Sequence, residues 1–272
     1  MARKRYTFTE AKIVRFIHEG RGSGVGRDYK PWIKVSDVPS RGRTHRPYCA
    51  KTGRVHHLLS DNEYYAFLSH WWDDSVIDLR EQFPLIDRRE TMKIAAWCGV
   101  RHPVDPISQA IWVITTDLLV TVSTPHGNTL RAFAIKESAD LENPRTLEKL
   151  EIERVFWISR DVPWLLMISD DLKNNFTRNL AWIFDPGPGT TGSVRARRID
   201  EILTPYLLEA IYTEHELPIR LICLAIDNDR GYPLGTTLGC LRRLLASKHL
   251  RAPLDVPLLQ DLPGSSFRIW NW

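Results

Sequence analysis

Cysteine is scarce in this sequence, and the patterns in which it usually stabilises a fold are missing. The 272 residues include four cysteines, Cys49, Cys98, Cys223 and Cys240. No two of them form a C-x-x-C pair, and none has histidine partners at the spacing of a zinc site. The sequence therefore predicts neither a disulfide framework nor a structural zinc ion.

Long apolar runs are missing as well. No stretch approaches the ~20 consecutive apolar residues that a membrane-spanning helix requires. The charged start, Met1 to Arg5, is not followed by the apolar segment of a secretory signal. We expect a soluble, cytoplasmic protein without membrane association. With 43% apolar residues and ten tryptophans, the chain can build a packed core.

The glycine-rich stretch from Gly20 to Arg27 lacks the Gly-Lys-Ser/Thr ending of a phosphate-binding loop, and it follows a helical pattern rather than a strand. This argues against a nucleotide-dependent enzyme. We expect a flexible basic loop, whose glycines and whose Arg21 and Arg27 would allow a close approach to a DNA backbone.

Basic charge is concentrated at the start of the chain. Residues 1–60 contain 14 Lys/Arg and 4 Asp/Glu, whereas the whole chain has a net charge of only +4. Clustered cations favour a polyanionic partner, because each one neutralises a phosphate and releases a counterion. A basic tract within residues 39–54 predicts DNA contacts by Arg41, Arg43, Arg46 and Arg54; a solvated basic face is the alternative.

Hydrophobic periodicity predicts alternating helices and strands. Helical patterns occur at 10–19, from Ser60 to Trp72 and at 145–157, and strand patterns at 76–85, 110–122, 130–138 and 163–168. The charged strand 76–85 suggests a sheet edge or a face towards solvent or DNA, and 163–168 reads as a central strand. This order favours an α/β nuclease-like core rather than a helical bundle.

Three residues of this core suggest metal-dependent phosphodiester chemistry. Glu63 stands in the first turn of the helix that begins at Ser60, where a capping box with Ser60 would also explain it. Asp117 interrupts an apolar strand. If its charge is buried, it needs a metal, a cation or strong hydrogen bonds; the alternative is an aspartate near the end of the strand. Lys136 lies on the next strand, on the face expected for Ser138.

The last third of the chain reads as a separate unit. Residues 185–193 have the composition of a linker or exposed loop. Helical patterns follow at 199–217 and 236–250, and the second carries Arg242, Arg243 and Lys248 opposite a leucine face. The exposed aromatic residues at 266–272 suit either partner docking or packing back onto the unit.

The sequence resembles the TnsA family of transposon-end endonucleases over most of residues 8–185. The resemblance is carried by the segments 53–61 (GRVHHLLSD), 80–85 (REQFPL), 116–117 (TD) and 145–151 (RTLEKLE). It implies a restriction-endonuclease-like, mixed-sheet catalytic domain of the PD-(D/E)xK type at residues 1–168. A mainly helical winged-helix domain that binds DNA or a partner would follow at 169–272.

The resemblance also implies a function. Members cut the 5′ ends of a transposon beside a TnsB-type transposase, which cuts the 3′ ends, and a TnsC-type ATPase. Glu63 and Asp117 fall on the acidic ligands of a Mg²⁺ site that Mn²⁺ can also fill. Glu137 is a further candidate ligand through its carbonyl.

The third motif of the family departs from its usual form in this chain. The family has Gln or Glu, any residue and then Lys, whereas the three positions here hold Lys136, Glu137 and Ser138. We predict that Lys136 replaces the missing lysine, because its long side chain can span the distance along one strand face. Lys149 on the next helix is the alternative source of the lysine. Two further alternatives are that catalysis is impaired in this chain, or that the chain is a non-catalytic DNA-binding subunit.

Overall fold

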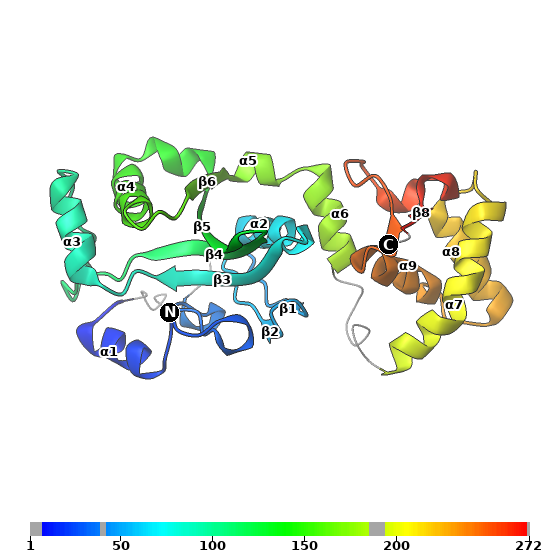
Figure 1. Cartoon of the computed structure of the whole chain (residues 1–272), viewed down its shortest axis with the longest axis horizontal. Coiled ribbons are helices and arrows are strands. Elements are labelled where there is room, and N and C mark those ends of the chain that lie inside the picture. The colour runs from blue at the N-terminus through cyan, green and yellow to red at the C-terminus, as the bar shows by residue number, and fades with distance from the viewer. Residues whose placement is uncertain (1–6, 39–41, 185–193, 271–272) are drawn as a thin grey trace, which may run out of the picture. The chain divides into compact units, whose positions relative to one another are not determined.

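The computed structural model describes residues 7–38, 42–184 and 194–270 (Figure 1). The chain divides into two compact units, 1–173 and 174–272, so the boundary lies at Lys173 where the sequence suggested 168. None of the helices in these ranges combines the length and the apolar character that crossing a membrane requires. Each unit is described by itself.

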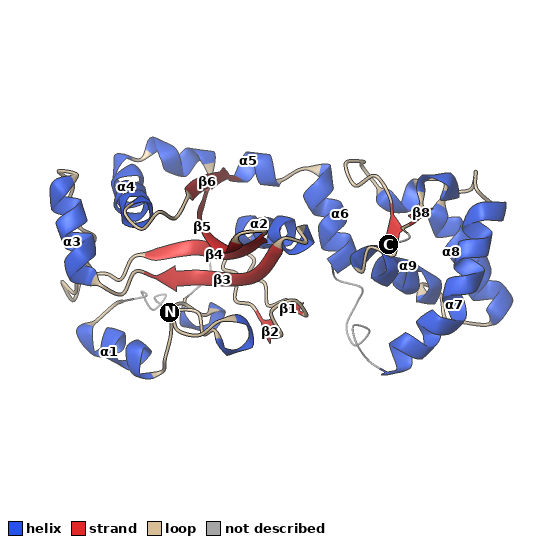
Figure 2. Ribbon diagram, viewed as in Figure 1, coloured by secondary structure: helices blue, strands red, loops and turns tan. Residues whose placement is uncertain are grey.

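The first unit is built on a four-stranded mixed sheet (Figure 2). Its strands are β3 (Val76–Pro84), β4 (Thr115–Thr124), β5 (Gly127–Lys136) and β6 (Trp164–Ile168), in the spatial order β3-β4-β5-β6. The pairs β3–β4 and β4–β5 are antiparallel, whereas β5–β6 is parallel. A parallel neighbour needs a crossover connection, and α4 (Pro144–Ile158) provides it.

Helices cover both faces of this sheet. Side chains of successive strand residues point to opposite faces, so Leu119 and Ala132 lie on one face and Phe133 lies on the other. The first face packs against α4 and α3 (Arg88–Trp97) in one apolar cluster. The other face carries α2 (Asp61–Trp72), whose His70 ring lies 4.3 Å from that of Phe133.

Shorter elements complete the first unit. They are α1 (Glu10–His18), the strand pair β1 (Tyr48–Cys49) and β2 (Arg54–Val55), α5 (Ser169–Leu172) and 3-10 turns at Gly26–Asp28, Val35–Asp37 and Ser138–Glu142. Two strand predictions are corrected here. The strand expected from residue 110 begins at Thr115, because Trp112 and Val113 pack instead into the cluster around α1. The strand expected to be central, β6, lies at an edge.

The glycine-rich stretch is an anchored turn rather than the predicted loose basic loop. Arg21 is only 7% exposed and donates to the Trp32 carbonyl and to Asp37. The amide of Gly26 donates to Asp78 on β3 at 3.2 Å. Arg21 is thus committed to the interior, and the prediction that it approaches DNA is wrong.

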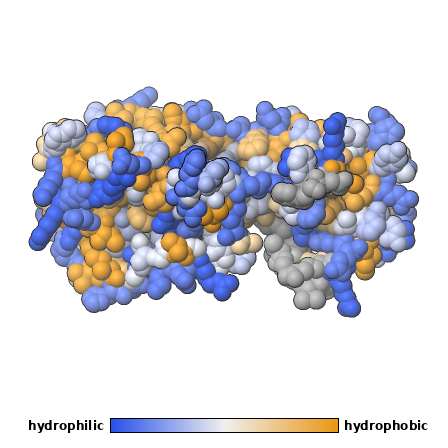
Figure 3. All heavy atoms as spheres, in the orientation of Figure 1, coloured by the Kyte–Doolittle hydropathy of each residue, from blue (hydrophilic) through white to orange (hydrophobic). Residues whose placement is uncertain are grey.

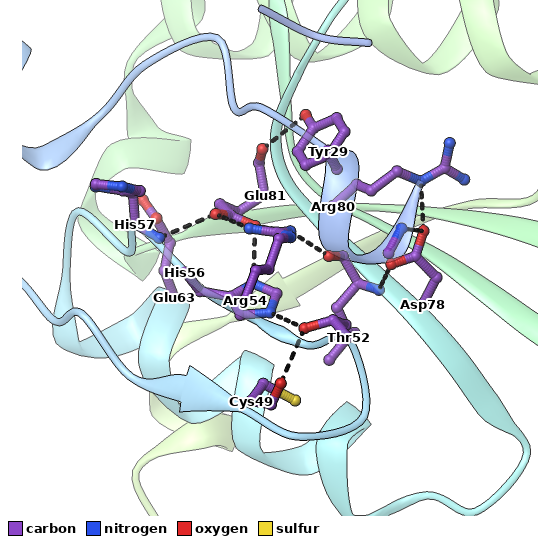
Figure 4. Close-up of polar contacts among 12 residues, drawn as sticks. Tyr29, Cys49, Thr52, Arg54, His56, His57, Glu63, Asp78, Arg80 and Glu81 are labelled. Carbon is purple, nitrogen blue, oxygen red and sulfur yellow. Dashed lines mark hydrogen bonds and ion pairs between the residues drawn. The ribbon is translucent and has the colours of Figure 1, made fainter. Parts of the chain in front are cut away.

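A buried ionic network ties the N-terminal segment to the edge strand β3 (Figure 4). Glu81 is fully buried, and its carboxylate accepts both terminal nitrogens of Arg54, at 2.8 and 2.6 Å. It also accepts from His56 Nδ1 and from the backbone amide of His57. The charged strand 76–85 is at a sheet edge, as expected, but Glu81 faces the interior.

The network shifts both of its titratable partners. Burial alone would raise the pKa of Glu81, but His56 and Arg54 lower it below its ordinary value of 4.5. Burial would likewise lower the pKa of His56, but the attraction of Glu81 outweighs it and the pKa is raised above 6.5. Glu81 therefore contributes stability that is present above pH 4.5 and is lost as the pH falls through its lower folded pKa.

The second unit is mainly helical. It comprises α6 (Asn175–Phe184), α7 (Val194–Thr213), α8 (Ile219–Arg230), α9 (Thr236–Ala246), the strand pair β7 (Leu250–Arg251) and β8 (Arg268–Ile269), and 3-10 turns at Leu259–Asp261 and Gly264–Ser266. The helix expected at 199–217 begins earlier, and α8 was not predicted. Buried Asp227 fixes the turn between α8 and α9 by accepting the amides of Gly235 and Thr237.

We predict that Glu81→Gln destabilises the protein by about 3–5 kcal/mol, because it leaves the buried guanidinium of Arg54 without a counter-charge. Urea unfolding at pH 7 measures the change. The control is Glu90→Gln, which removes the partly exposed pair with Arg160 and should cost about 0–1 kcal/mol. The difference between wild type and Glu81→Gln should shrink below pH 4.5. Equal losses in the two variants would contradict the network's role.

Candidate functional site

Asp117 lies where two neighbouring strands of the sheet part. The recorded pairing of β4 with β5 ends at Leu118 and Phe133, although both strands continue for three more residues. At this point a side-chain hydrogen bond takes the place of the backbone hydrogen bonds between the strands, because Asp117 Oδ2 accepts from the backbone amide of Ile135 at 2.8 Å. An aspartate is therefore tolerated inside this strand because the sheet opens beside it.

Lys136, the last residue of β5, completes this arrangement. Its Nζ donates to Asp117 Oδ2 at 2.6 Å and to the Ile135 carbonyl at 2.9 Å. The two side chains are 26% and 14% exposed, so one end of the pair reaches solvent. Burial lowers the pKa of Lys136, but the attraction of Asp117 and their hydrogen bond outweigh it and raise the pKa. The ammonium group therefore stays charged at neutral pH.

Glu63 reaches the same charge cluster from the first turn of α2. Ser60 caps this helix, since its side chain accepts the Glu63 amide at 3.1 Å. The reciprocal bond differs from the expected capping box: Glu63 Oε2 accepts the amide of Leu59, one residue before the cap. Burial, followed by the negative charge of Asp117, raises the pKa of Glu63 to about 8.

Glu153 is a candidate that the sequence reasoning missed. It lies on α4, is 4% exposed, and its Oε1 has no hydrogen-bond partner within the described residues. Burial and the charge of Asp117 raise its pKa to about 8. A signal was present in the sequence: Glu153 stands three residues after Leu150 and three before Phe156, on the buried face of an amphipathic helix.

Among the described residues, the remaining candidates Glu137, Ser138 and Lys149 form no hydrogen bond or ion pair with Asp117. The strand ends at Lys136, so Ser138 belongs to the following 3-10 turn, where its hydroxyl donates to Asp170. Glu137 is exposed, and its side chain accepts from Asn62 at 3.3 Å. Lys149 is half-buried; burial and then the charges of Arg145 and Lys136 lower its pKa. The ion pair with Asp117 is made by Lys136.

The residues proposed for DNA contact fall into three groups. Arg41 lies outside the described residues. Arg43 and Arg46 are exposed, and Arg43 pairs with Asp61 at the start of α2 at 2.9 Å. Arg54 is 8% exposed and its guanidinium is bound to Glu81, so it is not available to a phosphate. The assignment of Arg54 to DNA is corrected to a structural role.

The donor set suits a hard cation. Within the ranges that the structure describes, no three His, Cys, Asp or Glu side chains come close enough to hold a metal ion. The chain instead offers the carboxylates of Glu63 and Asp117, and the orphan buried oxygen of Glu153 lies in the same electrostatic cluster. Mg²⁺ typically binds through one or two carboxylates and keeps several waters, so this set fits it.

Comparison with known proteins decides the family. Residues 73–169 match the family model described as "TnsA-like endonuclease N terminal". The chain is also 39% identical, over 251 residues, to the Transposon Tn7 transposition protein TnsA of Escherichia coli. That alignment covers 92% of this chain and 89% of the relative. The chain belongs to the TnsA family. The matched family segment contains Asp117, Lys136 and Glu153, and it begins ten residues after Glu63.

We predict that Ser60→Ala destabilises the protein by about 1 kcal/mol, because the Glu63 amide loses its side-chain acceptor. The matched control is Asn143→Ala, which removes the cap of α4 and its bond from the Arg145 amide. Urea unfolding should report similar losses for both. Divalent-ion affinity should fall only in Ser60→Ala, since only that cap holds the turn carrying Glu63. An equal fall in both variants would contradict this.

Proposed function

We propose that this protein is a metal-dependent DNA endonuclease that cuts the 5′ ends of a transposon during transposition. The observation that carries the proposal is the Asp117–Lys136 ion pair where β4 and β5 cease to pair. The charges of both residues also act on the pKa of Glu63. The relative's name describes a transposition protein, and the family model describes an endonuclease domain. Through its family, the chain would work with a TnsB-type transposase and a TnsC-type ATPase.

Glu63 and Asp117 would hold the metal ion, Mg²⁺ or alternatively Mn²⁺. Bound there, the ion would polarise the scissile phosphate and lower the pKa of a bound water. Glu153, buried in the same cluster, would set the total negative charge that the ion meets. Glu137 is proposed as a ligand only through its backbone carbonyl, since its side chain is exposed and accepts from Asn62.

Lys136 would supply a positive charge next to the reacting groups. Its ammonium group is fixed against Asp117 and stays protonated, so it can orient a nucleophilic water by hydrogen bonding. The same group can stabilise the negative charge that builds on the phosphoryl oxygens in the transition state. Lys149 carries a second, half-buried positive charge near Lys136 and remains the alternative source of the catalytic lysine.

The basic tract would bring the DNA backbone to this site. Arg43 and Arg46 are exposed on the segment that lies against the start of α2, two residues before Glu63. His45 also pairs with Asp61, and its ring stacks on Tyr64 at 4.2 Å, which fixes the course of the segment. Arginines placed in this way position a duplex without reading its sequence.

For the second unit we propose a winged-helix arrangement. The α8–turn–α9 pair would be its helix-turn-helix, and β7 and β8 would be the strands beside the wing. An isolated bridge between Pro218 and Pro263 supports this, because it places a short strand segment between α7 and α8. This unit would bind DNA or a partner protein.

A second candidate function is a DNA-binding subunit without catalysis. Such a subunit would need the basic tract and the helical unit, but not a buried cluster of carboxylates. Placing Glu63, Asp117 and Glu153 in one electrostatic cluster costs stability, because like charges repel and burial removes their hydration. An endonuclease needs this cluster to hold its metal ion, whereas a subunit that only binds DNA has no use for it.

We predict that Glu63→Ala and Asp117→Ala abolish Mg²⁺-dependent nicking of transposon-end DNA in the presence of the transposase. Lys136→Ala should lower the rate by about 10²–10³-fold, as expected for loss of one group that stabilises transition-state charge. Lys149→Ala is the matched lysine control and should nick at close to the wild-type rate. Normal nicking by Glu63→Ala would refute the nuclease. An inactive Lys149→Ala beside an active Lys136→Ala would reverse the lysine assignment.

We also predict that Mg²⁺ or Mn²⁺ stabilises the wild-type protein, by about 2.7 kcal/mol when the free ion is at 100 times its Kd. Thermal unfolding with and without the ion measures this. Asp117→Asn should lose the stabilisation. Asp78→Asn, which changes another acidic residue of the sheet, should retain it. A metal effect that survives in Asp117→Asn would place the ion elsewhere.

A further inference from the structure

The strand pair of the second unit presents two arginines side by side. In the antiparallel register of β7 and β8, Arg251 is directly opposite Arg268, and both are exposed. Like charges directly opposite each other on a strand pair are destabilising. Such a pair is explained if both charges are kept for an anionic ligand.

Neither arginine is neutralised by the part of the protein that the structure describes. No carboxylate among the described residues forms an ion pair with Arg251 or Arg268. Two other arginines of the same unit differ in this respect. Arg220 pairs with Asp261 at 2.6 Å, and Arg243 pairs with Asp200 at 2.5 Å. The β7–β8 pair is therefore a locally uncompensated positive surface.

An aromatic ring holds one of the two guanidinium groups in place. Arg251 lies over the ring of Trp270, 3.3 Å from its centroid, and Trp270 itself is 43% exposed. The Trp270 amide donates to the His249 carbonyl, which continues the strand pairing beyond β8. A guanidinium fixed in this way loses less conformational entropy when it binds a phosphate.

The basic helix that the sequence singled out does not provide this surface. On α9, Arg243 is bound to Asp200, and Arg242 is half-buried with its guanidinium 5.2 Å from the Trp182 ring. The helix packs against α6, α7 and α8. Its two arginines therefore contact other parts of the unit, whereas both arginines of the strand pair are exposed.

We propose that Arg251 and Arg268 bind the phosphate backbone of double-stranded DNA, with Trp270 holding Arg251 in position. The identity of the polyanion rests on the proposed function, in which duplex DNA is the substrate; the site itself lies in the other unit and takes no part in cleavage. Two adjacent guanidinium groups suit phosphate oxygens, and they would add affinity without sequence specificity.

Figure 3 shows hydrophilic side chains interspersed with apolar ones on the face of the protein that it displays.

The test is binding of the full chain to a fluorescein-labelled DNA duplex, without metal, between 50 and 200 mM salt. The double variant Arg251→Gln/Arg268→Gln removes two phosphate contacts. The slope of log K against log salt should become shallower by about 1.8, so the loss of affinity across this range should be roughly tenfold smaller than for wild type. Arg220→Gln is the matched control, because its charge is already paired with Asp261; it should leave the slope unchanged.

A measurement on the unmodified protein accompanies the variants. Phenylglyoxal modification followed by mass spectrometry should show that duplex DNA protects Arg251 and Arg268. Equal modification with and without DNA, or an unchanged salt slope in the double variant, would overturn the proposal. Because no metal is present, these results are independent of cleavage. The nicking assay with Asp117→Ala addresses only the proposed nuclease. If this variant loses nicking but still binds DNA, the result says nothing against the binding surface.

Discussion

The Asp117 carboxylate is the feature on which the candidate site depends. One oxygen accepts both the amide of Ile135 and the ammonium group of Lys136, at the point where β4 and β5 cease to pair. The side chain thus satisfies a backbone donor that the sheet no longer satisfies, and it fixes the lysine at the same time. An apolar residue at position 117 would leave both donors without this acceptor, which is costly at a part-buried position.

The second constraint is the placement of Glu63 relative to Asp117. Glu63 lies at the start of α2, and the chain leading to it is held by the Glu81 carboxylate through Arg54, His56 and the His57 amide. The ionic network on the edge strand is therefore connected to the site by a short stretch of backbone. This explains why a fully buried charge cluster exists in a segment that sequence reasoning treated as a DNA-binding surface.

The lysine of the candidate site illustrates how a positive charge can be placed beside Asp117 from the end of a strand. Lys136 is the last residue of β5, whereas Ser138, where the family resemblance implied the lysine, lies beyond the end of the strand. The Lys136 side chain folds back along β5 to reach Asp117. The flexible four-carbon stem of lysine allows this.

Much of the architecture was readable from the sequence, because periodic patterns report which side of an element is buried. The helix from Ser60, the helix at 145–157 and the charged edge strand were predicted and are confirmed. The acidic pair and Lys136 were chosen from residue type and position, and the structure brings their charges together. Patterns failed where burial is decided by distant contacts, as for residues 110–114.

The sequence by itself determined most helices and strands of the first unit, the division into two units and the residue types available for metal and phosphate chemistry. Only the tertiary structure decided which charges are free. Arg21 and Arg54 were predicted to contact DNA, but each is bound to a carboxylate distant in sequence. Helical periodicity places Glu153 on a buried face, but only folding brings its charge near that of Asp117. Charge neutralisation depends on which side chains meet in space, and no local pattern contains that information.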